Sequence, residues 1–198
     1  MVFIDPQVEQ ILQETILPDL RKGRKDFDLP HTKAVVFWMK ELLQSLSDQS
    51  LDSQVLITAA YAHDWGYIGL FDGVDSTNIE VIHKMKPLHM VRGSQLITQL
   101  IDEKLSAYFT TKQKEHVAHL VRMHDRVEEL KTTDEILLME ADTLGMIDAN
   151  KVKPTFSKED NQTFMQRELM GRRLPRFQHD YAKKIAEELA DSRERYYS

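Results

Sequence analysis

His63 and Asp64 are two polar residues at the end of a stretch of sequence that is otherwise almost entirely apolar. The run from Val55 to Ala62 has the composition of a buried helix, and the pair follows it directly. Burying a carboxylate and an imidazole together costs free energy unless something pairs with them. A divalent cation would pair with both, so metal binding is one chemistry that this pair could support. The alternative is that Asp64 caps a turn and that His63 is a hydrogen-bonded histidine of the core.

Four more polar residues lie at core-facing positions of other predicted helices. Asp142 comes four residues after Leu138 and four residues before Met146, so it shares their helix face. This face could instead be half exposed, which would leave the carboxylate of Asp142 in water. Single histidines lie near the ends of three further helical stretches: His31, His89 and His124. Five predicted helices together contribute four imidazoles and two carboxylates.

The remaining histidines are weaker candidates for metal binding. His83 competes with His89, but a glycine one turn after His89 would let that helix approach a crowded site. His116 and His119 are three positions apart and could hold a metal, although a surface or structural role is the simpler interpretation. His179 precedes an aspartate that is well placed to cap the next helix, which argues against a metal site there.

The elements that must position these residues are helices. Apolar residues recur at spacings of three and four, and no segment shows the alternation of a strand. The sequence therefore predicts an all-α fold. Helices are expected at about 6–17, 29–46, 52–65, 89–101, 111–124, 133–147, 161–172 and 180–196, with a short segment at 79–84 ahead of Pro87.

The composition is that of a globular protein. The chain has 198 residues, with 26 Lys and Arg against 32 Asp and Glu, so its net charge is −6. This acidic balance disfavours a general nucleic-acid binder. The lack of cysteine excludes disulfide scaffolds, Cys-ligated zinc sites, iron–sulfur clusters and thiol nucleophiles. No apolar run is long enough to cross a membrane and the N-terminus lacks signal-peptide features, so we expect a cytoplasmic protein without a membrane partner.

The order of the candidate ligands resembles that of the HD superfamily of metal-dependent phosphohydrolases. The matching motifs are His31 in Pro-His-Thr-Lys-Ala-Val, His63-Asp64 in Tyr-Ala-His-Asp-Trp-Gly, and Asp142 in Glu-Ala-Asp-Thr-Leu. The resemblance covers about residues 27–150.

The architecture implied by this resemblance is one HD-type domain over residues 1–198. It would be a helical bundle with its HD core at about 27–150, an N-terminal helix before it and a C-terminal helical extension at 151–198. The extension could cover the core or form the interface of a homodimer. Its run of arginines between Arg167 and Arg176 could form a lid over an anionic substrate, although such runs are more often solvated faces.

The resemblance also implies hydrolysis of a phosphoester by water that divalent metal ions activate. We expect a small phosphorylated substrate, such as a nucleotide or another metabolite. Asp64 would bridge two ions, and catalysis would centre on Asp64 and the second histidine pair, His89 and His124. One or two ions per chain are expected, and these ligand types suit Fe, Mn, Co, Ni or Zn better than Mg. The implied metal ligands are His31, His63, Asp64, His89, His124 and Asp142.

The chain departs from the family's pattern just after the His-Asp pair. Many members have His-Asp-X-Gly-Lys, whose lysine helps to hold phosphate, whereas Tyr67 stands in place of that lysine here. The phosphate contact is then expected from nearby cations, and the candidates for substrate binding are Lys84, Lys86 and Arg92. The chain also lacks the Gly-Tyr-Pro motif of cyclic-dinucleotide phosphodiesterases, so that substrate is not expected.

Two other functions are compatible with the sequence. A few enzymes on this scaffold, similar to inositol oxygenase, use six ligands in this order to hold two irons and activate dioxygen. Some HD-like domains are non-catalytic signalling modules that have lost their ligands, whereas this chain has all six candidates. Iron with a redox-active optical band would indicate the oxygenase, and a lack of bound metal would indicate the signalling module.

Overall fold

A computed structural model describes residues 3–46 and 50–197 of the chain. These residues form eight α-helices joined by short 3₁₀ and π-helical segments, and they contain no β-strand. The predicted all-α fold is therefore confirmed. The helices are α1 (Pro6–Asp19), α2 (Asp28–Ser45), α3 (Ser53–Ala62), α4 (Ile79–Leu100), α5 (Thr111–Met123), α6 (Thr133–Ile147), α7 (Lys158–Thr163) and α8 (Asp180–Tyr196).

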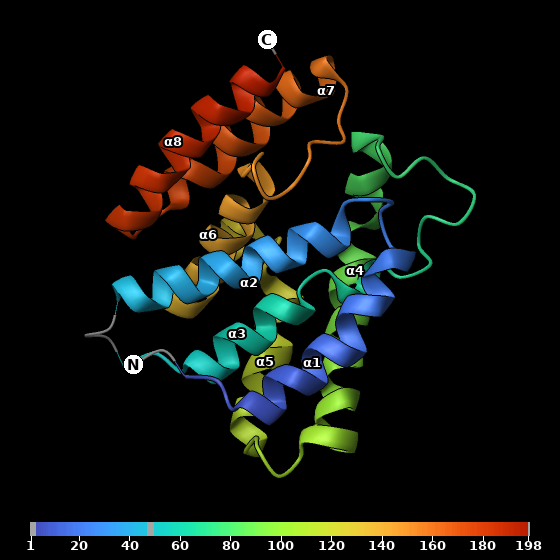
Figure 1. Ribbon diagram of the computed structural model, residues 1–198, viewed down its shortest axis with the longest axis vertical. Coiled ribbons are helices and arrows are strands. Elements are labelled where there is room, and N and C mark those ends of the chain that lie inside the picture. The colour runs from blue at the N-terminus through green and yellow to red at the C-terminus, as the bar shows by residue number, and fades with distance from the viewer. Residues whose placement is uncertain (1–2, 47–49, 198) are drawn as a thin grey trace.

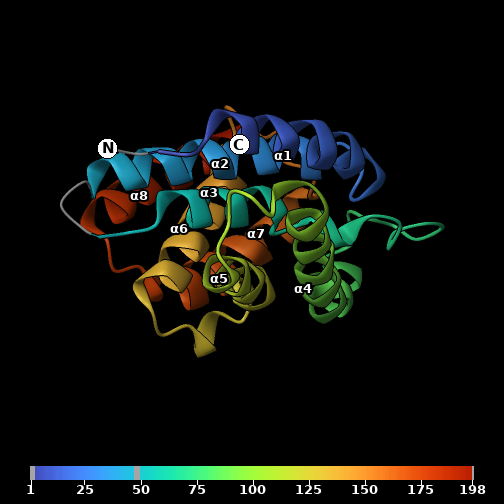
Figure 2. The ribbon, with the colours of Figure 1, turned by 90° about the horizontal axis from the view of Figure 1, so that it is seen from below.

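The helices pack around one large apolar core, and two small apolar clusters lie apart from it. α2 lies against α3 and α6, α5 lies against α3 and α4, and α8 packs on α6 and α2 (Figure 1). Seen from below, α1 and α2 lie on one side of the molecule and α5 lies on the other (Figure 2). A single cluster of buried apolar residues runs from Val8 in α1 to Ala186 in α8. The C-terminal extension therefore shares its apolar core with the rest of the chain.

Gly145 sets the closest approach between α2 and α6. A β-carbon at this position would lie 2.6 Å from Val35 Cγ2 and 3.0 Å from Val35 N. Glycine lets the two helices come this close because it has no side chain. About one turn earlier in each helix lie His31 and Asp142, and the same approach brings Nε2 of His31 to 3.0 Å from Oδ1 of Asp142.

Gly66 has a similar role between the end of α3 and α4. The chain after α3 continues through a 3₁₀ turn, Trp65–Tyr67. A β-carbon on Gly66 would lie 1.9 Å from the carbonyl oxygen of His89 and 2.6 Å from the amide nitrogen of Gly93. This backbone contact holds the turn that follows Asp64 directly against the helix that carries His89.

α4 is one continuous helix from Ile79 to Leu100, so the predicted break before Pro87 is wrong. Proline removes one backbone hydrogen bond and usually ends or kinks a helix. In α4 the residues on both sides of Pro87 are buried, with Ile82 before it and His89 and Met90 after it. Packing of this face against the core outweighs the local cost of the proline.

The extension contains a π-helix where the sequence predicted an amphipathic α-helix at 161–172. α7 ends at Thr163, and the chain continues as a ten-residue π-helix, Phe164–Arg173. Its last hydrogen bond joins the amide of Leu174 to the carbonyl of Leu169, five residues earlier. The predicted helix at 180–196 agrees with α8.

Gly145→Ala should destabilise the fold by about 1–3 kcal/mol, because the added methyl group would overlap Val35. Urea unfolding followed by circular dichroism measures this difference. In a Val35→Ala background the same substitution should cost less, because the nearest atom, Cγ2, has been removed. If the two substitutions change the free energy of unfolding additively, the contact between position 145 and Val35 is contradicted.

Candidate metal centre

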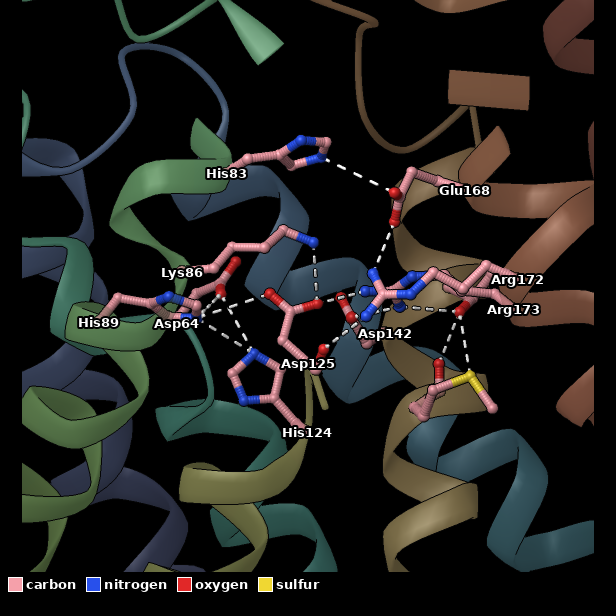
Figure 3. Close-up of polar contacts among 12 residues, drawn as sticks. Asp64, His83, Lys86, His89, His124, Asp125, Asp142, Glu168, Arg172 and Arg173 are labelled. Carbon is pink, nitrogen blue, oxygen red and sulfur yellow. Dashed lines mark hydrogen bonds and ion pairs between the residues drawn. The ribbon is translucent and has the colours of Figure 1, made fainter. Parts of the chain in front are cut away.

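Asp64 lies at the centre of four buried histidines, and each of its carboxylate oxygens faces a different pair. Oδ2 is 3.5 Å from Nε2 of His31 and 3.4 Å from Nε2 of His63. Oδ1 is 3.4 Å from Nε2 of His89 and 3.6 Å from Nε2 of His124. Figure 3 shows the second pair converging on Asp64 from two different helices. Two groups of candidate ligands therefore share one carboxylate, and each group could hold a metal ion.

Asp142 adds a second carboxylate to the first histidine pair. Its Oδ1 lies 3.0 Å from Nε2 of His31 and 3.7 Å from Nε2 of His63. None of the six residues is more than 4% exposed. The structure thus brings together all six residues that the sequence analysis named as metal ligands.

Two of the histidines are oriented by carbonyl groups of their own helices. Nδ1 of His63 donates a hydrogen bond to the carbonyl of Ala60 at 2.9 Å, and Nδ1 of His124 donates to the carbonyl of Val121 at 2.8 Å. These bonds direct Nε2 of each ring toward the centre. Burial lowers the pKa of His63, but the charge of Asp64 outweighs burial and raises this pKa to about 9. A metal ion at Nε2 of His63 would therefore displace a proton.

The other two histidines are oriented by aromatic stacking. His31 stacks on Phe27 with ring centroids 4.9 Å apart, and His89 stacks on Tyr67 at 3.9 Å. Nδ1 of each ring is buried and has no hydrogen-bond partner among the residues that the structure describes. Burial lowers the pKa of both histidines, which favours the neutral form that binds metal ions.

The two carboxylates of the centre are held in their ionised form. Burial alone would raise the pKa of Asp64, but the charges of His63 and Arg24 hold it well below its usual range. Burial also opposes ionisation of Asp142, and there the charge of Arg173 lowers the pKa. The donor set of the centre is therefore two carboxylates and four imidazoles, which suits divalent transition metals.

Arg24 is a residue of the site that sequence reasoning missed. Its guanidinium bridges the carboxylates of Asp28 and Asp64. It also lies over the ring of Tyr67, 4.3 Å from the centroid. Tyr67 stands where the family's pattern has a lysine. The guanidinium of Arg24 therefore places a positive charge over the residue that replaces this lysine. Nothing in the charged connector before α2 distinguishes Arg24 from its neighbours in the sequence.

Asp125 connects the centre to two further cations (Figure 3). Its Oδ1 accepts hydrogen bonds from Nζ of Lys86 at 3.2 Å and from Nη2 of Arg173. Its Oδ2 lies 3.9 Å from Nε2 of His89. The sequence contained a signal, since Asp125 follows His124 directly, but three such His-Asp pairs occur in the chain and the dipeptide alone did not separate them.

Arg173 brings the C-terminal extension into contact with the metal centre. Its Nη1 donates a hydrogen bond to Oδ2 of Asp142 at 2.8 Å, and the side chain is only 1% exposed. The interpretation of the arginine run as a solvated face is therefore wrong at this position. In an α-helix, the nine steps from Phe164 to Arg173 would make about two and a half turns, so the two side chains would point in opposite directions. In the wider π-helix, both side chains line one cavity.

Only one of the three predicted substrate-binding cations lies in this cavity. Lys86 lines it beside Asp125. Lys84 is exposed, and Arg92 is half-buried, and neither belongs to the cavity wall. Lys86 precedes His89 by three residues and shares its face of the continuous helix α4.

The four histidines outside the centre each pair with a carboxylate elsewhere. His83 lies 3.8 Å from Glu168 at the cavity, and His179 lies 2.6 Å from the buried Glu140. The remaining two contact the first turn of α6, as the structural interpretation expected. Their distances are 3.2 Å for His116 to Asp134 and 2.6 Å for His119 to Glu135.

A narrow cavity lies beside the centre, and the space in it that is open to a water-sized sphere is about 50 Å³. Three carboxylates, those of Asp64, Asp125 and Asp142, lie at its polar end, with Lys86 and Arg173 beside them. The remaining walls are mainly apolar and include Ile79, Ile82, Met146, Phe156 and Phe164.

Comparison with known families identifies the chain. The HD domain model matches residues 29–147, which is more than half of the sequence. The chain therefore belongs to the HD domain family, whose members are generally metal-dependent phosphohydrolases. Searches of curated proteins and of solved structures found no significant match. Among the residues that the structure describes, no helix is long and apolar enough to cross a membrane.

Arg173→Met should destabilise the metal-free protein by about 3–5 kcal/mol, because Asp125 and Asp142 would lose their buried cation. The neighbouring substitution Arg172→Met is a matched control. Arg172 pairs with Glu128 and Glu168 at a partly exposed position, so its loss should cost less than about 1 kcal/mol. Urea unfolding in the presence of a chelator measures both values, and equal costs would contradict the assignment.

Proposed function

We propose that this chain hydrolyses a phosphoester of a small metabolite with two divalent metal ions held at Asp64. The observation that carries the proposal is the division of the Asp64 carboxylate between two histidine pairs. His31 and His63 face Oδ2, while His89 and His124 face Oδ1. Asp142 would complete the first ion's ligands, and Fe, Mn, Co, Ni or Zn would suit the donor set better than Mg.

When bound, such a metal pair supplies a nucleophilic water at neutral pH and neutralises charge on the phosphate. The chain's own cations would bind the phosphate from the cavity side. We assign this role to Lys86 and Arg24, which both line the cavity. Arg24 presents a planar guanidinium that can bind two phosphate oxygens at once, and Tyr67 supports it from below. Lys84 and Arg92 lie outside the cavity wall, which favours Lys86 over them.

Asp125 would orient the attacking water. Its Oδ2 lies beside His89 and its Oδ1 is held by Lys86 and Arg173, so one oxygen remains on the side of the second histidine pair. Those cations keep the pKa of Asp125 well below its usual range although burial opposes this. An ionised carboxylate can accept a hydrogen bond from water and direct its lone pair toward phosphorus.

Metal content tests the proposed centre. Protein purified without added metal should carry about two equivalents of a transition metal per chain, and Asp64→Ala should lose both, because the bridging carboxylate serves both ions. Elemental analysis gives the count, with His116→Ala as a control that removes a histidine outside the centre. One equivalent would restrict the site to the first group of ligands. No metal after soaking with Mn, Fe or Zn would refute the proposal and favour a signalling module, and iron with a redox-active band would favour the oxygenase.

Phosphate binding by Lys86 predicts a difference between two nearby lysines. Lys86→Met should raise KM for 4-nitrophenyl phosphate by roughly tenfold, because one charged contact to the phosphate is lost. Lys84→Met should leave KM unchanged, since Lys84 is exposed and outside the cavity. Steady-state kinetics with the Mn-loaded protein measures both. A larger rise in KM for Lys84→Met than for Lys86→Met would assign phosphate binding to Lys84.

A further inference from the structure

Arg193 is a buried cation that lines the same cavity from the C-terminal extension. The side chain is 1% exposed although it belongs to the last turns of α8. Its Nε donates a hydrogen bond to Oδ1 of Asn161 at 2.7 Å, and its Nη1 donates to the carbonyl of Met146 at 2.7 Å. Its guanidinium carbon lies 5.2 Å from the ring centroid of Phe164, which also lines the cavity.

The partners of Arg193 differ from those of the other buried arginines at the cavity. Arg24 contacts two carboxylates, and so does Arg173. Within residues 3–46 and 50–197, no carboxylate lies at ion-pair distance from Arg193, and no hydrogen bond reaches its Nη2. Burial lowers the pKa of Arg193 to about 10. The carbonyl of Met146, at the end of α6, carries only a partial negative charge, so most of the guanidinium charge stays uncompensated.

The other charged side chains at this part of the cavity do not provide the missing charge. Glu168 lines the cavity, but its carboxylate already pairs with Arg172 at 2.9 Å and lies 3.8 Å from His83. The carboxylate of Asp125 already pairs with Lys86 and Arg173. The cavity therefore contains one guanidinium whose balancing anion is not supplied by the described protein.

Apolar side chains lie in the cavity wall together with Arg193. Phe156 and Phe164 have ring centroids 5.8 Å apart, and Met146 and Ile82 line the same space. A flat or apolar group fits walls of this kind. These apolar side chains line the same cavity as Asp64, Asp142 and Arg193.

We propose that Arg193 is a second anion-binding subsite, and that the substrate carries a carboxylate or a second phosphate at the end remote from the phosphoester. This inference rests on the proposed function for the position of the phosphoester. Arg193, Asn161, Phe156 and Phe164 all follow residue 147, so substrate selection resides in the extension and outside the region that the HD family model matches.

The test compares phenylphosphonate with 3- and 4-carboxyphenylphosphonate, which resist hydrolysis and differ only in the second anion. Calorimetry with the Mn-loaded protein should show at least one carboxylated probe binding roughly tenfold more tightly than phenylphosphonate, because a charged contact is gained. Arg193→Gln should remove this preference. Arg176→Gln is the matched control, since Arg176 also lies in the extension and donates to a backbone carbonyl, that of Leu130, but does not line the cavity.

Asn161→Asp gives a second test that keeps Arg193 in place. The substitution changes the oxygen next to Nε into part of a carboxylate and so supplies the anion from the protein itself. The preference for the carboxylated probes should fall several-fold, whereas a purely structural Arg193 predicts an equal effect on all three probes. This variant decides the question if Arg193→Gln does not fold.

The outcomes separate the subsite from the proposed function. Equal binding of the three probes, no binding of any, or a preference that survives Arg193→Gln would overturn the subsite. Hydrolysis of phenyl phosphate and 4-carboxyphenyl phosphate is then measured on the same preparations. If neither ester is hydrolysed but the Arg193-dependent preference persists, the subsite stands and the hydrolase proposal fails. If the esters are hydrolysed but no carboxylated probe is preferred, the hydrolase proposal stands and the subsite fails.

Discussion

The structure depends on a concentration of buried negative charge. Asp64, Asp125 and Asp142 all lie within one cluster below the protein surface, and each is at most 8% exposed. Carboxylates in such a position require cations at short range. Arg24, Lys86 and Arg173 supply part of this charge from three separate segments, and metal ions are the natural complement to the imidazoles between them. The folding of the connector before α2, of α4 and of the extension is therefore tied to one electrostatic requirement.

The six residues that converge at the candidate metal centre could be named from the sequence because their signal is local. A polar residue within an apolar helical stretch, as for His63, Asp64 and Asp142, has to be explained by a partner. The family's order of histidines then connected these positions with His31, His89 and His124. Gly93 gave a further correct signal, because a glycine one turn after His89 indicated a close helix approach. In the structure Gly93 faces Gly66, where α4 meets the turn after Asp64.

The residues around the candidate ligands could not be singled out from their neighbours in the sequence, because their positions depend on backbone features without a local signal. Pro87 indicated a helix end between Lys86 and His89. The prediction therefore did not show that both residues lie on one face of a continuous helix. Arg173 was obscured by the π-helix, since a sequence pattern is judged with the period of an α-helix. Arg24 faces the site only because the chain before α2 folds back over Tyr67, and no periodicity describes such a connector.

The hydrogen bond from Arg173 to Asp142 has a consequence for how this protein can be divided. The family match ends at residue 147, but Asp142, a candidate ligand of the centre, is held by a side chain located beyond that boundary. The matched region is thus smaller than the part of the chain that shares the apolar core. A fusion or a minimal fragment made by cutting at the family boundary would separate a carboxylate from its counter-ion and uncover the apolar core.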